Sequence, residues 1–462
     1  MRGCRFAIPV LLAACCTSGQ ASGGDVTVAA DVPGELSPAE RGYRFLTRKP
    51  YLPPDFDRTT FDNLWRWWPE PDRSEAEKAT VAERRRMTFA RYGLVENPAS
   101  PDAGAALGYV ETPDGWVMNC LACHGGKVAG QVIPGLPNSH FALQTLTEEV
   151  SAVKLLQLKP LAHLDKAALG IPLSTTNGTT NSVVFGIVLG ALRNPDMSVD
   201  TNKPIPPLVH HDMDPPPLWH VRKKRRLYVD GFAPKSPRPL LQFMMIPRND
   251  RDTLVGWETD YADVLAWMES LAPPEYPYDI DHDRSLRGRG VFEAHCAECH
   301  GTYGDDWTYP ERTVPIEEIG TDPARLTALT PEHRRWMQIG WMSRFGEDEV
   351  ILEPVGYVAP PLDGIWATGP YFHNGSAPTL WHVLHPDARP TVWRRTRDGY
   401  DRERVGLEVT EFDELPETVR EPWDRRQYFD TRLPAKSAGG HTFVDELTEG
   451  EKRDVLEYLK TL

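Results

Sequence analysis

Two pentapeptides carry the clearest chemistry in this sequence, Cys120-Leu-Ala-Cys123-His124 and Cys296-Ala-Glu-Cys299-His300. Two thiols followed directly by a histidine are typical of a covalent c-type haem site, in which thioethers hold the porphyrin and the histidine ligates iron. Residues i, i+3 and i+4 share one face of a helix, so both sulfurs and the imidazole can meet one porphyrin. The alternative is a zinc ion held by all four cysteines, but zinc needs no histidine after each pair. The sequence therefore predicts two covalently bound haem c groups.

Length and charge narrow the class of protein. A chain of 462 residues has room for more than one domain. Its formal charge of -15 argues against nucleic acid as a partner and leaves a basic redox partner compatible with the sequence.

The first residues have the features of an export signal. Arg2 and Arg5 precede the apolar run 6–16, which is too short to cross a bilayer as a helix. Within it, Leu12-Ala13-Ala14-Cys15 resembles a bacterial lipobox, so Cys15 is the expected site of a lipid anchor; cleavage near 21–23 is the alternative. We therefore expect a leader over residues 1–23 and a mature protein on the periplasmic side of a bacterial membrane, touching that membrane only through the lipid.

A short duplication indicates how the rest is organised. The segment 263–271, Asp-Val-Leu-Ala-Trp-Met-Glu-Ser-Leu, aligns with 454–462, Asp-Val-Leu-Glu-Tyr-Leu-Lys-Thr-Leu, and both have apolar residues at helical spacing. Thr448 and Glu451 have the spacing of a capping box for the second helix. This pattern predicts two cytochrome c domains, each closed by a C-terminal helix that packs on the helix carrying the haem motif.

The domain boundary falls in Pro273-Pro-Glu-Tyr-Pro-Tyr-Asp279, which cannot continue a helix. The prediction is a mainly α fold with two cytochrome c-type haem domains in tandem, over 24–275 and 276–462. Long loop insertions are expected to fill the remainder, among them 204–217 and 396–432.

Spacing alone leaves several candidates for the second ligand of each iron. His124 and His300 are the expected proximal ligands. On the N-terminal side, His140 ends a short loop that can fold back over a haem as a ligand or a gate, with a surface histidine as the alternative; His210-His211-Asp212 is another candidate cluster. On the C-terminal side the open candidates are His373, His385, His441, Met337 and Met342. His441 is preferred because its glycine-rich loop shortly precedes the final helix.

The segment from Pro360 to Leu380, containing Gly-Pro-Tyr-Phe-His-Asn-Gly, resembles a signature of the di-haem cytochrome c peroxidases and their relatives. Those relatives include the methylamine-utilisation di-haem enzyme and the di-haem rubber oxygenases. The rubber-oxygenase-like branch is the most similar, because Phe429-Asp-Thr-Arg-Leu-Pro precedes the Gly-Gly-His441 loop. The resemblance implies that His441 closes the C-terminal haem as an electron-transfer centre. It also implies that the N-terminal haem keeps a face for peroxide or dioxygen, and it allows a calcium ion between the domains.

The sequence departs from the peroxidases at one point of chemistry. In them, a stretch similar to Tyr228-Val-Asp230-Gly231 leads into a glutamine and a glutamate with acid/base roles. Here residues 232–249 contain Gln242 and no glutamate, and breaking peroxide heterolytically requires a group that moves a proton. The loop 175–185 resembles the family's lining of the N-terminal haem's distal side. Phe185 would face that pocket there, or else lie in the core.

These observations lead to an exported di-haem oxidoreductase. His300 and His441 would hold an electron-transfer haem, and His124 the reactive one, with His140 and Phe185 as candidate catalytic residues. Trp219 and Trp257 are equal candidates for an electron relay, and a small redox protein or a quinol-linked donor would supply electrons. The alternatives are a pure electron-transfer cytochrome and an oxygenase that cleaves an unsaturated hydrocarbon.

Overall fold

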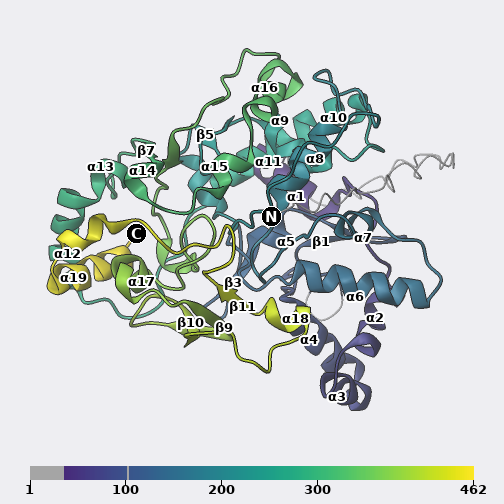
Figure 1. Ribbon diagram of the computed structural model, residues 1–462, viewed down its shortest axis with the longest axis horizontal. Helices are drawn as coiled ribbons and strands as arrows, with labels where there is room; N and C mark the ends of the chain where they lie inside the picture. Colours follow the sequence, from purple (N-terminus) through teal and green to yellow (C-terminus); the bar gives the residue numbers. More distant parts are fainter. Residues whose placement is uncertain (1–35, 101–103) are drawn as a thin grey trace, which may run out of the picture.

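The computed structural model describes residues 36–100 and 104–462 (Figure 1). The expected leader and Cys15 lie outside the described residues. The fold is mainly helical with small antiparallel sheets, and the part of the chain described contains no helix with the length and hydropathy to span a membrane.

The helices of the N-terminal half are α1 (Pro38–Arg48), α2 (Arg58–Asp62), α3 (Asp72–Lys78), α4 (Val81–Tyr92), α5 (Leu121–His124), α6 (Leu143–Leu156), α7 (His163–Ala168), α8 (Ser182–Ala191), α9 (Pro237–Leu240), α10 (Arg251–Gly256) and α11 (Glu258–Ser270). Those of the C-terminal half are α12 (His282–His295), α13 (Ala297–His300), α14 (Ile316–Ile319), α15 (Ala324–Ala328), α16 (Pro331–Ile339), α17 (Leu380–Leu384), α18 (Pro422–Arg425) and α19 (Glu449–Leu459).

The strands form one three-stranded sheet and several two-stranded antiparallel pairs. Strand β9 (Val392–Asp401) lies between β10 (Gly406–Phe412) and β11 (Tyr428–Asp430). The two-stranded pairs are β1 (Tyr109–Thr112) with β2 (Gly115–Met118), β3 (Gly125–Val128) with β4 (Gln131–Pro134), β5 (Arg226–Leu227) with β6 (Ala233–Pro234), and β7 (Thr313–Pro315) with β8 (Gly356–Val358).

The two halves repeat one helix crossing. Helix α1 packs on α11, and α12 packs on α19 at the left edge of Figure 1. Both crossings require glycine, because a Cβ on Gly42 would lie 2.0 Å from the carbonyl oxygen of Asp263 and one on Gly288 would lie 1.9 Å from that of Asp454. The arginine before each glycine then pairs with the facing aspartate, Arg41 with Asp263 at 2.7 Å and Arg287 with Asp454 at 2.8 Å. The duplication inferred from the closing helices is therefore also present in their partners.

The partner of the first closing helix differs from the prediction. Helix α12 does end directly before Cys296, as expected, but α11 packs on α1, which ends at Arg48, far ahead of Cys120. The reason is that α2, α3, α4 and the β1–β2 hairpin are inserted between α1 and the motif. The capping box of α19 is confirmed: the Thr448 hydroxyl accepts from the Glu451 amide while the Glu451 carboxylate accepts from the Thr448 amide.

The segment 396–432 is a sheet and not the loop insertion that was expected. It contains most of β9, with β10, α18 and β11. Its Arg426 bonds Thr145 at 3.0 Å and also pairs with Glu148, both on α6, so that the sheet region holds onto the N-terminal half (Figure 1). The linker 273–279 is irregular, as predicted, while the division into two haem domains stays a prediction.

Candidate haem sites

Both proximal histidines make the same hydrogen bond. His124 ends α5 and its Nδ1 lies 2.9 Å from the carbonyl oxygen of Pro216, while His300 ends α13 and its Nδ1 lies 2.8 Å from that of Pro360. A carbonyl only accepts, so each Nδ1 carries the proton and each Nε2 keeps a lone pair for a metal. Burial lowers the pKa of His124 to about 4 and also lowers that of His300. Protons therefore do not compete for the ligating nitrogen near neutral pH.

The two cysteine pairs do not converge. Within the described ranges, no three His, Cys, Asp or Glu side chains gather into a group that could hold a metal ion. The Cys4 zinc alternative is therefore wrong, and calcium stays a prediction without a candidate cluster in the described chain. All four thiols are unpaired and partly buried. Burial raises the pKa of Cys120 to about 11 and that of Cys123 and Cys296 to about 12.

His441 faces His300. Their ring centres are 6.4 Å apart, whereas two imidazoles on opposite sides of one metal ion, each bonded at about 2 Å, have centres roughly 6–6.5 Å apart. Burial and the nearby His300 and Arg389 lower the pKa of His441 to about 3. Its Nδ1 is buried without a hydrogen-bond partner. This pair of neutral imidazoles therefore fits the two axial positions of one haem.

The loop that carries His441 is fixed from two sides. The His441 amide donates to the carbonyl of Ile319 at 2.7 Å, and the residue has a left-handed backbone with φ of 53°. Arg389 donates through Nη1 to the carbonyls of Ala438 at 2.6 Å and Gly440 at 2.7 Å. Arg389 therefore positions the loop, a role that the sequence did not signal.

The rival ligands of the C-terminal site lie elsewhere. His373 packs on Tyr357, with ring centres 4.5 Å apart. His385 stacks on Trp381 at 4.2 Å and its Nδ1 donates to the Trp381 carbonyl. Met337 and Met342 are buried in a separate apolar cluster. Of the candidate histidines, His441 is the one whose ring lies against that of His300.

His124 has no such counterpart in the described chain, since none of the ring pairs found there includes it. His140 follows the first motif, but its Nε2 lies 3.4 Å from the carbonyl of Thr396 on β9. His210 pairs with Asp212 at 2.6 Å, and Lys436 pairs with the same carboxylate at 3.1 Å. His140 therefore meets a carbonyl of another segment, and His210 meets a carboxylate of its own loop.

Two other residues mark the N-terminal site. Phe185 on α8 packs against the same apolar cluster as Cys123. The next residue, Gly186, lies against Gln242, because a Cβ there would be 2.6 Å from the Gln242 Oε1. The Gln242 Nε2 is buried and has no hydrogen-bond partner. Phe185 and the glycine that contacts this amide are thus successive on α8, while the amide itself comes from the 3-10 helix Leu241–Met244.

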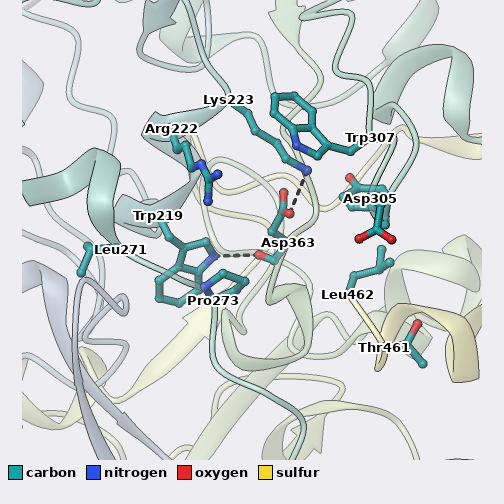
Figure 2. A pocket seen from close by; sticks show the side chains of 12 residues that line it. Trp219, Arg222, Lys223, Leu271, Pro273, Asp305, Trp307, Asp363, Thr461 and Leu462 are labelled. Atoms are coloured by element: carbon teal, nitrogen blue, oxygen red, sulfur yellow. Dashed lines mark hydrogen bonds and ion pairs between the residues drawn. The ribbon is translucent and has the colours of Figure 1, made fainter. Parts of the chain in front are cut away.

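A tryptophan joins the loops behind both proximal histidines. The indole Nε1 of Trp219 donates to the Asp363 carbonyl at 2.7 Å (Figure 2). Trp219 comes three residues after Pro216, and Asp363 three residues after Pro360, so each loop continues from the carbonyl that binds a proximal histidine. Trp257 instead packs edge-on against Tyr51 at 4.9 Å. The repeat Pro216-Pro-Leu218 and Pro360-Pro-Leu362 was the sequence signal for this arrangement.

A buried arginine fits a further part of the cofactor. Arg395 has buried Nη1 and Nη2 atoms with no hydrogen-bond partner, and a Cβ on Gly178 would lie 2.4 Å from its Nη1. A buried guanidinium is expected to meet an anion. Asp214 acts on Arg395 electrostatically but makes no hydrogen bond to these two atoms, so one of the two haem carboxylates is a candidate partner for them.

Comparison with known proteins supports the class of cofactor. Residues 356–394 match the family model described as "RoxA-like, cytochrome c-like". Two curated relatives from Sinorhizobium fredii are both described as uncharacterised: y4iM is 28% identical over 43% of this chain and 53% of its own length, and y4iJ is 30% identical over 42% and 41%. The chain thus matches about half of these relatives or less. A solved structure of Kuenenia stuttgartiensis hydrazine synthase aligns with 66% of this chain and 93% of its own length, at 14% identity. Its TM-score is 0.24, which is too low to indicate a common fold.

A cytochrome c-like domain is therefore present in this chain, and it implies covalently bound haem c. The RoxA-like match indicates a haem-containing oxidoreductase or oxygenase. It covers the loop in which Pro360 accepts from His300 and Asp363 accepts from Trp219.

Proposed function

We propose that this protein is an exported di-haem c-type oxidoreductase in which the two haems have different roles. The haem held by Cys296, Cys299 and His300 is closed by His441 and transfers electrons. The haem held by Cys120, Cys123 and His124 keeps one face for peroxide or dioxygen. Haem iron supplies the redox chemistry and the binding of that oxidant.

One observation carries the proposal. His300 faces a second imidazole at 6.4 Å, whereas His124 has no imidazole opposite it among the described residues. A bis-histidine iron has no position left for a substrate, while an iron without a second protein ligand can bind one. Each site has its own pair of cysteines, a proximal histidine and a carbonyl that accepts from that histidine. The difference between the sites is therefore on the distal side.

Electrons are proposed to pass between the sites through Trp219. The indole is hydrogen-bonded to the loop behind His300 and belongs to the loop behind His124. Gly364 lets the indole approach, because a Cβ there would lie 3.1 Å from its Cζ2. The donor to the C-terminal haem would be a small redox protein or a quinol-linked donor.

Phe185 and Gln242 are proposed to border the reactive face. The unpaired Nε2 of Gln242 could donate a hydrogen bond to a bound oxygen atom, but an amide does not exchange protons as a carboxylic acid does. This difference favours an oxygenase as the second candidate, acting on an unsaturated hydrocarbon, over an efficient peroxidase. The RoxA-like match supports the same alternative.

Two assays test the proposal. Haem content by the pyridine haemochrome method should give two haems per chain, and Cys120→Ala with Cys123→Ala should remove one of them. Peroxide consumption with a reduced donor, compared with cleavage of a carotenoid or polyisoprene under oxygen, then separates the two activities. A protein with two haems and neither activity would be an electron carrier, and the proposal would be wrong.

A further inference from the structure

A cavity of about 380 Å³ opens beside Trp219 (Figure 2). It lies where the 3-10 helix Leu218–Arg222 meets the loop of Asp363 and the loop after α13. Trp219, Tyr303 and Trp307 supply aromatic walls, and Arg222, Lys223, Asp305 and Asp363 supply charge, so the lining is more polar than apolar. A cavity of this size can hold a small organic ligand that carries polar groups.

Asp363 brings a charged side chain to this cavity. Its Oδ1 pairs with Lys223 at 2.8 Å, and its carbonyl accepts from Trp219 and from His220. The side chain is 22% exposed, while its Oδ2 atom is closed to solvent. A ligand hydroxyl in the cavity would therefore meet the ion pair of Asp363 and Lys223 and not the Oδ2 atom.

Lys223 holds the opposite wall in place. Its Nζ lies 4.5 Å from the ring centre of Tyr303 and 4.6 Å from that of Trp307. The ammonium group thus contacts two aromatic rings as well as the carboxylate, and its bond to Asp363 is drawn in Figure 2. Trp307 is 42% exposed, so its side chain is open to a ligand that enters from solvent.

We propose that this cavity binds a small phenol or hydroquinone, with its hydroxyl toward the ion pair of Lys223 and Asp363 and its ring between Trp307 and Trp219, and that this molecule is a reductant of the protein. The proposal rests on the proposed function, because it needs haem as the electron acceptor. Bound there, the ligand lies directly against the indole that joins the two proximal loops.

On oxidation the ligand's O–H bond breaks, its proton passes to water at the open side of the cavity, and one electron passes through Trp219 to a haem, which would serve as the one-electron acceptor. The ligand leaves as a neutral radical. A hydroquinone can repeat the step and leave as the quinone.

Binding is tested first, without redox chemistry. Calorimetry of the oxidised holoprotein with resorcinol, which reduces poorly, should show one site per chain, and 1,3-dimethoxybenzene should bind weakly because it has no hydroxyl. Trp307→Ala should weaken resorcinol binding about tenfold, a loss of about 1.4 kcal/mol. The control is Trp67→Ala, which removes a tryptophan that is 49% exposed on another segment. No binding, or equal binding by the wild type and Trp307→Ala, would overturn the site.

Reduction is tested separately by stopped flow with hydroquinone. The rate of haem reduction should saturate with concentration, and Trp307→Ala should raise the half-saturating concentration about tenfold while dithionite reduces both proteins alike. Equal rates in both proteins would overturn the role as reductant. If haem itself is absent, the proposed function is wrong, whereas resorcinol binding still tests whether the cavity is a ligand site.

Discussion

The indole of Trp219 donates a hydrogen bond to the carbonyl oxygen of Asp363 at 2.7 Å. This bond connects two loops that each also bind a proximal histidine, through Pro216 and Pro360. The two haem motifs are far apart in the sequence, yet one side chain bonds their loops to each other. Trp219→Phe should therefore slow electron transfer between the haems while leaving both haem spectra unchanged. Flash photolysis of the partly reduced, CO-bound protein measures that rate, and Trp257→Phe is the matched control.

Replacing His441 by alanine should open the C-terminal haem. The loss of the imidazole 6.4 Å from His300 removes the second axial ligand, so one low-spin haem should become high-spin. Optical and EPR spectra measure the change, and added imidazole should restore the low-spin signal. His385→Ala is the control, because that ring stacks on Trp381 instead. An unchanged His441→Ala spectrum would remove the assignment.

Replacing Arg389 should also change the spin state of the C-terminal haem, because Arg389 holds the loop that carries His441. Arg389→Met removes the donors to the part-buried carbonyls of Ala438 and Gly440. A fully buried acceptor left without a partner costs roughly 1–3 kcal/mol, so these two should cost less. The loop should then release His441 part of the time, giving a mixture of spin states that increases with temperature. Arg389→Lys should restore part of the low-spin fraction. A fully low-spin Arg389→Met protein would show that the loop does not depend on this side chain.

The helix crossings give a stability test with a control in the same helix. Gly288→Ala should destabilise the protein by about 1–3 kcal/mol, because its Cβ would overlap the Asp454 carbonyl. Gly290→Ala on the same helix, α12, meets nothing within 4 Å and should stabilise it by up to about 1 kcal/mol. Urea unfolding followed by tryptophan fluorescence measures both. Equal effects of the two substitutions would contradict the described crossing.

Asp230 should make stability depend on pH. Burial alone would raise the pKa of this carboxyl, but Arg325 and Arg334 outweigh burial and lower it below 3.8. Since the folded-state pKa is the lower one, the stabilisation is complete above the unfolded-state pKa and is lost as pH falls through the folded-state value. Asp230→Asn should cost roughly 3–5 kcal/mol at neutral pH, since it leaves two buried arginines without their anion. The same change at Asp252, which is exposed, should have little effect.

The motifs and the closing helices could be read from the sequence because their signals are local. Two Cys-x-x-Cys-His units and the capping box of Thr448 and Glu451 depend only on neighbours along the chain. The pairing of α11 with α1 could not be found in that way, since a long insertion separates α1 from its motif. The need for glycine at each crossing could not be predicted either, because it depends on a carbonyl of the facing helix.

The contacts between the two halves could not be predicted from the sequence either. Trp219 and Trp257 were equal candidates until the Asp363 carbonyl separated them. The sheet of β9, β10 and β11 was read as a charged loop because its strands carry many exposed arginines and glutamates. Its alternation of apolar and polar residues over 406–412 was the available signal.

EPR spectroscopy of the fully oxidised holoprotein, with and without cyanide, tests the difference between the two haems directly. We expect two unequal ferric haems: one bis-histidine low-spin signal that cyanide leaves unchanged, and a second signal that cyanide converts to a new low-spin species. Cys296→Ala with Cys299→Ala should remove the first signal. Two low-spin signals that both resist cyanide would show that the His124 haem has no open face.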